Sequence, residues 1–148
     1  MARFRFRLQA VLDHREAVEQ ERQRAVAEVE RERVRLEGVI RECHRRITVE
    51  KGEQRRGLLA GDLGAARRQA SAGARYSTEA QRAAIELAGA YARLERARAA
   101  LLEAAKARKA VELLRERHLE QWRAEESRRE NAAADELSVM RAGRKEAV

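Results

Sequence analysis

Residues 104–136 read AAKARKAVELLRERHLEQWRAEESRRENAAADE. The segment contains neither Gly nor Pro and is built almost wholly from residues that favour helices. Glu and Arg alternate through it, as they do on the solvated faces of a long exposed helix. Its larger apolar or aromatic side chains recur at helical spacing, and those on one line are Val111, Leu114, His118 and Trp122. The pattern predicts a long helix with a narrow apolar stripe.

The composition of the whole chain favours a coiled coil over a broad globular core. Charged residues make up 39% of the 148 residues and aromatic residues only 3%, and Pro is absent. A coiled coil needs only a narrow apolar seam, and a chain without Pro can form long uninterrupted helices. We therefore expect a single all-α domain.

A first helix is predicted over about residues 4–51. Its apolar positions are separated by three or four residues or by multiples of seven, which is the spacing of a coiled-coil seam. These positions are Leu8, Val11, Leu12, Val18, Ala25, Val29, Leu36, Ile40, Cys43 and Ile47. At 1.5 Å per residue the helix would be ~70 Å long.

A turn region is predicted over about residues 52–77, and a second helix over about residues 78–141. Five of the eight Gly residues lie between Gly52 and Gly73, and Gly favours turns over helix interiors. The reversal of the chain is expected near Gly57–Gly64. The second helix would be ~95 Å long.

The second helix carries its own start and stop signals. Thr78 and Gln81 have the spacing of a capping box, and Gly143 is placed to end the helix. The seam is rich in Ala between Ala80 and Ala110, so the partner helix could approach closely. The stripe is expected to run through Ala84, Leu87, Tyr91, Leu94, Leu101, Ala105, Val111, Leu114, His118 and Trp122.

The two helices are expected to pair antiparallel within one chain. A turn centred near residues 64–66 places residue i opposite about residue 130 − i, so Leu8 would lie near Trp122. The second helix would project beyond the pair from about Asn131 onward. Pairing between two chains fits the same apolar pattern, but the glycine cluster provides a local return with a low loop-closure cost. The predicted fold is therefore a long two-helix antiparallel coiled-coil hairpin.

The net charge of +8 is concentrated in two places. Residues 51–76 hold six basic and two acidic residues, and Arg3, Arg5 and Arg7 have no acidic neighbour at the start of the chain. Such patches suit an acidic protein surface, an anionic lipid or a nucleic acid. Solvated Arg side chains on exposed helix and loop explain the same pattern equally well.

No catalytic or metal-binding pattern is visible in the sequence. The adjacent Cys43 and His44 would point about 100° apart on a helix, and no Cys-x-x-Cys or His-x-x-x-His pattern accompanies them. A Gly-x-x-x-x-Gly-Lys phosphate loop is absent as well. We therefore expect no enzyme, no cofactor, no metal and no small-molecule substrate.

The cellular compartment is expected to be the cytoplasm. The single Cys fits a reducing compartment, and the first residues do not resemble a secretory signal. No apolar run approaches the ~20 residues that span a bilayer. Peripheral association with a membrane stays open.

Phe4 and Phe6 lie two residues apart, so they cannot both face the seam of one helix. Two interpretations are open. In the first, the helix start is frayed and one ring packs against the region of Trp122. In the second, both rings form an exposed hydrophobic and basic tip that docks a partner.

The two ends of the chain together resemble the flagellar export protein FliJ family. The opening MARFRFRLQAVLDHR of residues 1–15, followed by Glu19, resembles the opening of that family. KAVELL of residues 109–114 resembles its closing signature, together with Trp122, Glu126, Arg129, Glu130, Asp135 and Glu136. The resemblance implies partner-binding roles for the matched positions. They are Phe4, Phe6, Leu8, Arg15, Lys109, Val111, Glu112, Leu114, Trp122, Glu126, Glu130, Asp135 and Glu136.

This resemblance implies a non-enzymatic component of the flagellar type III protein export apparatus. Members of the family are antiparallel coiled coils similar to the stalk of the rotary ATP synthase gamma subunit. The resemblance implies insertion into the central pore of the hexameric export ATPase. Our own hypothesis, from the aromatic residues at the open end of the hairpin, is that this end, around Phe4, Leu8 and Trp122, enters the ring. The resemblance also implies contacts with the cytoplasmic domain of the membrane export gate and with export chaperones. The location would be the cytoplasmic side of the inner membrane at the flagellar base.

One departure from the family concerns the region that leads into the second helix. Family members often carry several aromatic residues there, whereas Ala and Gly prevail here and Tyr76 is nearly alone. No gate-contacting residue is therefore inferred.

Two alternatives remain. The first is the equivalent stalk protein of a virulence type III secretion system. The second is a basic coiled coil that binds nucleic acid, which the Arg clusters suggest. The chain lacks a basic-region helix of the kind that enters a DNA groove, so no nucleic-acid partner is expected.

Overall fold

Two helices make up nearly all of the chain in the computed structural model, which describes residues 3–146 and the side chains of residues 3–141. Helix α1 spans Gln9–Leu59 and helix α2 spans Leu63–Glu146. Within the described residues there is no β-strand. The prediction of an all-α fold is confirmed.

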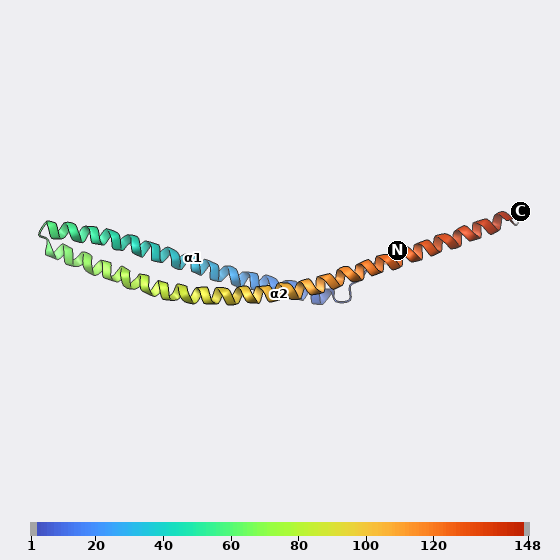
Figure 1. Ribbon diagram of the computed structural model, residues 1–148, viewed down its shortest axis with the longest axis horizontal. Helices are drawn as coiled ribbons and strands as arrows, with labels where there is room; N and C mark the ends of the chain where they lie inside the picture. Colours follow the sequence, from blue (N-terminus) through green and yellow to red (C-terminus); the bar gives the residue numbers. More distant parts are fainter. Residues whose placement is uncertain (1–2, 147–148) are drawn as a thin grey trace. The chain divides into compact units, whose positions relative to one another are not determined.

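The chain divides into two compact units, and each contains one segment of α1 and one segment of α2. The terminal unit comprises Met1–Glu19 and Glu103–Val148, and the central unit comprises Gln20–Leu102. In the central unit the two helices run in opposite directions on either side of the turn that joins them (Figure 1). The prediction of an antiparallel helical hairpin is confirmed.

Leucine and alanine side chains form the core of the central unit. Leu36, Ala83 and Ala90 make a buried cluster, against which Val39, Ile40 and Leu87 pack. Leu36 exposes 1% of its surface and Ala90 exposes none. A stripe of small side chains lets the opposite helix approach closely, and dispersion contacts then accumulate along the seam. The predicted alanine-rich seam is confirmed.

The seam of α2 is offset by one residue from the predicted line near its start. Ala80, Ala83, Ala90 and Leu94 are buried, whereas Ala84 and Tyr91, which were predicted to lie on the seam, are exposed. With the half-buried Leu87 included, steps of three and four residues connect these positions, as coiled-coil packing requires. Alanine suits buried and exposed positions of a helix alike, so the sequence did not show which of two adjacent alanines lies on the seam.

The reversal takes only three residues, 60–62. Gly61 has φ +77°, a left-handed conformation that Gly adopts without steric cost. The Asp62 N–H donates to the Gly57 carbonyl at 2.9 Å, and the Gly61 N–H donates to the Leu58 carbonyl at 3.2 Å. These two bonds form a Schellman motif that satisfies the last carbonyls of α1. The Ala65 N–H donates to Asp62 Oδ1 at 2.9 Å, so Asp62 also caps the start of α2.

The prediction of a turn region over residues 52–77 is wrong, although the reversal lies inside the expected Gly57–Gly64. Residues 52–59 belong to α1 and residues 63–77 belong to α2. Gly73 lies inside α2, where an added Cβ would stand 3.8 Å from Glu50 Cβ of the opposite helix. Helix pairing on both sides of the turn offsets the helix cost of Gly, which is ~1 kcal/mol relative to Ala.

The predicted helix ends also need correction. Thr78 does not cap α2, because it lies within the helix and its Oγ1 donates to the Ala74 carbonyl at 3.1 Å. Asp62 caps the helix instead, more than four turns earlier. Helix α1 begins at Gln9 rather than near residue 4, and α2 continues through Gly143.

The register of the pairing differs from the predicted one by two to five residues. Glu19 pairs with Arg108 in the terminal unit, and Glu30 pairs with Arg98 in the central unit. The residue numbers of these pairs add up to 127 and 128, against the expected value of about 130. The largest difference is at the ion pair between Glu32 and Arg93, whose numbers add up to 125. The shift follows from the turn, because Gly61 lies a few residues before the predicted centre.

Candidate partner-binding surfaces

Aromatic side chains from the two ends of the sequence meet in the terminal unit. The ring centroids of Phe4 and Trp122 lie 6.0 Å apart with the planes tilted by 55°. Those of Phe6 and His118 lie 5.8 Å apart with the rings edge to face. Both geometries are ones that aromatic pairs prefer. Phe6 is buried, whereas Phe4 and Trp122 are half-buried and keep part of their surface available.

Both phenylalanines contact α2 because residues 3–8 are not helical. Residues 3–6 have no regular secondary structure, so Phe4 and Phe6 are not held to the ~100° per residue of a helix. Their rings can therefore meet Trp122 and His118, which are about one helical turn apart on α2. The interpretation in which an aromatic ring packs against the region of Trp122 is therefore confirmed, and it holds for both rings.

Charged residues link α1 and α2 in the same unit. The Arg108 guanidinium donates to a Glu19 carboxylate oxygen across the helix pair and to Glu112 at 2.8 Å along α2. Lys109 Nζ donates to Glu112 at 3.1 Å. Hydrogen bonds from Lys109 and Arg108 lower the pKa of Glu112, and the bond to Glu19 raises the pKa of Arg108. Of the residues proposed from the resemblance, Lys109 and Glu112 thus form ion pairs along α2, and the contact with α1 is made by Arg108 through Glu19.

The other residues proposed from the resemblance are half-buried on the α2 seam, half-buried beside an arginine, or exposed to solvent. Val111 and Leu114 are half-buried on the α2 seam, while Leu8 and Arg15 are exposed. Glu126 is half-buried and lies 3.8 Å from Arg129. Farther along α2, Glu130, Asp135 and Glu136 are exposed.

The four acidic residues near the end of α2 do not form one site. Glu126 and Glu130 are about one helical turn apart and lie on one side, whereas Asp135 lies on the opposite side. Every described side chain from Ser127 to Arg141 is exposed. This part of α2 therefore presents all of its faces rather than one.

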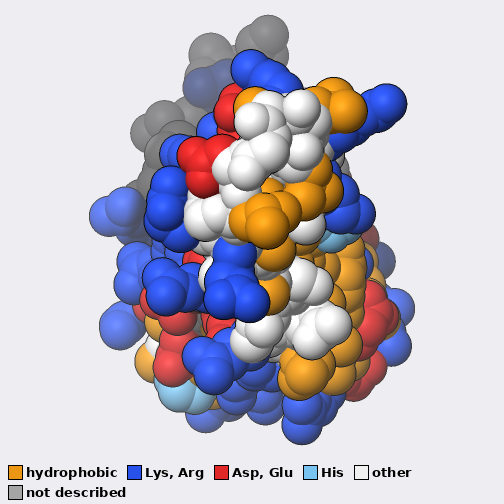
Figure 2. Space-filling view, turned by 90° about the vertical axis from the view of Figure 1, so that its left-hand side faces the viewer, with side chains coloured by type: hydrophobic (Ala, Val, Ile, Leu, Met, Phe, Trp, Pro, Cys, Tyr) orange, Lys and Arg blue, Asp and Glu red, His pale blue; other side chains and the backbone are white. Residues whose placement is uncertain are grey.

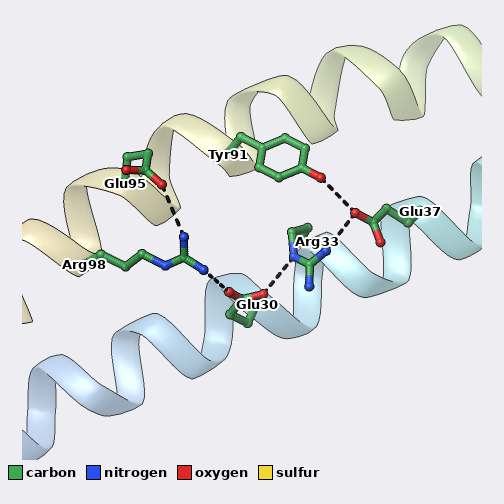
Figure 3. A network of polar contacts seen from close by, with 6 residues as sticks. All are labelled: Glu30, Arg33, Glu37, Tyr91, Glu95 and Arg98. Atoms are coloured by element: carbon green, nitrogen blue, oxygen red, sulfur yellow. Dashed lines mark hydrogen bonds and ion pairs between the residues drawn. The ribbon is translucent and has the colours of Figure 1, made fainter.

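A network of six residues in the central unit was not predicted (Figure 3). Arg33 donates to Glu30 at 2.7 Å and to Glu37 at 2.8 Å along α1. Across the helix pair, the Tyr91 hydroxyl donates to Glu37 at 2.9 Å and Arg98 donates to Glu30 at 2.7 Å. Arg98 also contacts Glu95.

The network favours the ionised form of Glu30 and of Glu37. The hydrogen bond from Arg33 is the main cause that lowers the pKa of Glu30, and the bond from Tyr91 is the main cause that lowers the pKa of Glu37. The i,i+3 and i,i+4 spacing of opposite charges could have indicated the bonds within α1. The bonds across the pair depend on a register that the sequence did not fix.

The described residues carry few groups suited to other chemistry. No group of three or more His, Cys, Asp or Glu residues there could hold a metal ion. Cys43 is buried in the central unit, and burial raises the pKa of its thiol. Neither described helix combines the length and the apolar character that a membrane crossing requires.

The comparisons with known proteins give one family. The family model described as flagellar FliJ protein matches residues 4–147, which is nearly the whole chain. The search of curated proteins gives no match, and the search of solved structures gives none.

Proposed function

This chain belongs to the flagellar FliJ protein family, and from that premise we propose that it is a non-enzymatic stalk that engages the hexameric export ATPase. The family places the chain in the flagellar protein export apparatus. The stalk role specifies how it would act there. We place the contact with the ATPase on the terminal unit.

One observation carries this placement. The two family-like stretches lie at opposite ends of the sequence, yet Met1–Glu19 and Glu103–Val148 form a single compact unit. Phe4 and Trp122 pair there and keep part of their surface exposed. A half-exposed aromatic pair is the kind of anchor that dominates binding energy at protein interfaces.

The surface around the Phe4–Trp122 pair suits a partner that rotates or changes conformation. Leu8 and Val11 expose 39% and 40% of their surface, and charged side chains surround them. Exposed charges bind weakly in water, since the attraction between them is screened. A stalk inside a ring of subunits needs such a surface, which does not bind any one subunit too tightly.

The proposal includes coupling to other parts of the export apparatus. We propose that the chain links the ATPase to the cytoplasmic domain of the membrane export gate and handles export chaperones. It would then work at the cytoplasmic side of the inner membrane at the flagellar base. The exposed part of α2, residues 127–141, offers an unpaired helix for such a partner.

ATP hydrolysis by the purified export ATPase of the same organism tests the proposal. Addition of this protein should stimulate hydrolysis, with saturation near one chain per hexamer. Trp122→Ala should reduce the stimulation several-fold, because it removes the aromatic anchor. Leu102→Ala, at a leucine that is 56% exposed in the central unit, is the matched control and should leave the stimulation unchanged.

Circular dichroism of each variant shows whether the helices have formed. A Trp122→Ala protein that is fully helical and stimulates the ATPase normally would remove the terminal unit from the contact. No stimulation by the unchanged protein, and no effect on ring assembly, would count against the stalk role itself.

A further inference from the structure

Three leucines at the turn between α1 and α2 are exposed. Leu58 exposes 53% of its surface, Leu59 exposes 80% and Leu63 exposes 71%. Single exposed leucines are common on proteins, but three within six residues at a reversal form a patch. Figure 2, which looks onto this end of the central unit, shows hydrophobic side chains with Lys and Arg side chains on their flanks.

Arginines from both helices accompany these leucines. Arg55 comes from α1, while Arg67 and Arg68 come from α2, and all three are exposed. None of them forms an ion pair with any side chain that the structure describes. We call the three leucines and these three arginines the turn surface.

The acidic groups near the turn surface already have partners. Asp62 accepts the hydrogen bond from the Ala65 N–H that caps α2. Glu53 forms an ion pair with Arg56 at 2.9 Å. Residues 53–68 hold four arginines against these two acidic residues, so the turn keeps a net positive charge of +2 that is available to a ligand.

We propose that the turn surface binds an anionic lipid bilayer. The leucines enter the boundary between headgroups and acyl chains, and the arginines contact lipid phosphates. This inference does not depend on the contact with the ATPase.

The arrangement of charges favours a bilayer over an acidic protein. The apolar side chains lie at the reversal, and cations flank them from α1 and from α2. A bilayer offers anionic groups on every side of an inserted apolar group and hydrocarbon beneath it. Peripheral proteins that bind membranes stably also combine two signals, an apolar one and a basic one. The turn surface supplies both signals.

Co-sedimentation of the whole protein with lipid vesicles tests the proposal. The vesicles contain phosphatidylcholine alone or phosphatidylcholine with about 30% phosphatidylglycerol, which sets the surface charge. The unchanged protein should partition onto the anionic vesicles at least ~10-fold more strongly than onto the neutral ones, and added salt should weaken the binding.

Two variants test the apolar part and the basic part of the turn surface separately. Leu59→Ser with Leu63→Ser removes the apolar part, and Arg55→Gln with Arg67→Gln and Arg68→Gln removes the charge. Each should lower partitioning onto anionic vesicles at least ~10-fold. The changed side chains are exposed, so the helices should still form.

Matched controls come from exposed positions elsewhere. Ile85→Ser with Leu102→Ser changes two apolar side chains that are 75% and 56% exposed in the central unit. For the charge, the control is Arg115→Gln with Arg117→Gln and Arg123→Gln, at exposed arginines of α2. Both controls should bind the vesicles like the unchanged protein.

Equal binding of the turn variants and the controls would overturn the proposal. So would equal binding of the unchanged protein to neutral and anionic vesicles. If the unchanged protein does not bind anionic vesicles but the turn variants impair flagellar motility in cells, the turn surface belongs to an acidic protein partner and the bilayer is excluded.

Discussion

At the scale of single residues, Leu36 is one of the two largest fully buried side chains in the described residues. It exposes 1% of its surface and packs with Ala83 and Ala90 across the helix pair. Leu36→Ala should lower the free energy of unfolding by about 2–5 kcal/mol, because it leaves a cavity among side chains that cannot close around it. Urea unfolding measures the change. Val34→Ala, at a position that is 53% exposed, should change stability by less than ~1 kcal/mol.

Tyr91 is expected to act through its hydroxyl group. The bond from this hydroxyl is the main cause that lowers the pKa of Glu37. Tyr91→Phe should therefore raise the pKa of Glu37 toward its ordinary value, while Glu30, whose pKa depends on Arg33, should change little. An NMR titration of the glutamate side chains measures both values. An unchanged pKa of Glu37 would mean that the bond across the helix pair is absent in solution.

Some candidate residues could be identified from the sequence and others could not. The apolar pattern of residues 104–136 placed Trp122 on a stripe, and Phe4 meets it. The bond between Arg108 and Glu19 was not predicted, because many Arg and Glu residues stand at equivalent positions and only the register selects a pair. Charged residues are solvated on any exposed face of a helix, so the sequence does not indicate which of them bind a partner.

At the scale of helices and turns, the seam was easier to predict than the ends of the helices. The apolar spacing correctly gave two paired helices, since burial of a stripe depends on period alone. The glycines suggested a long turn region, but only Gly61 has a conformation that requires Gly. Gly52 and Gly73 lie within helices, because the pairing of α1 with α2 outweighs a weak local preference.

Two glycine substitutions should have opposite effects. Gly61→Ala should destabilise the protein by ~1–2 kcal/mol, because φ +77° brings a Cβ too close to the backbone. Gly52→Ala should stabilise it by up to ~1 kcal/mol, since the residue lies in α1 and an added Cβ would meet nothing within 4 Å. Thermal unfolding followed by circular dichroism measures both. The same sign for both changes would contradict the assignment of the turn.

At the scale of the whole molecule, charge governs the response to acid. Several carboxylates have a lowered pKa in the folded chain: hydrogen bonds from Arg45 and Arg46 lower that of Glu42 to about 2, and the pKa values of Glu30 and Glu37 are lowered as well. A group with a lowered folded pKa favours the folded state above its unfolded pKa. That contribution is lost as the pH falls through the folded pKa.

We therefore expect stability to decrease progressively from about pH 4.5 toward about pH 2. The urea midpoint at a series of pH values measures the decrease, and Glu42→Gln should reduce its size. Salt should weaken the effect, because these ion pairs are exposed to solvent. A midpoint that does not change over this range would show that the carboxylate bonds do not contribute.

The contact between Phe4 and Trp122 has a further consequence. Trp122 is the only tryptophan of the chain, and the ring it meets belongs to the segment before α1. Its fluorescence emission is therefore an intrinsic optical reporter of whether that segment is docked. Release of the segment would expose the indole to water and shift the emission to longer wavelength. Anything that displaces the first residues from α2 can thus be followed in real time without a label.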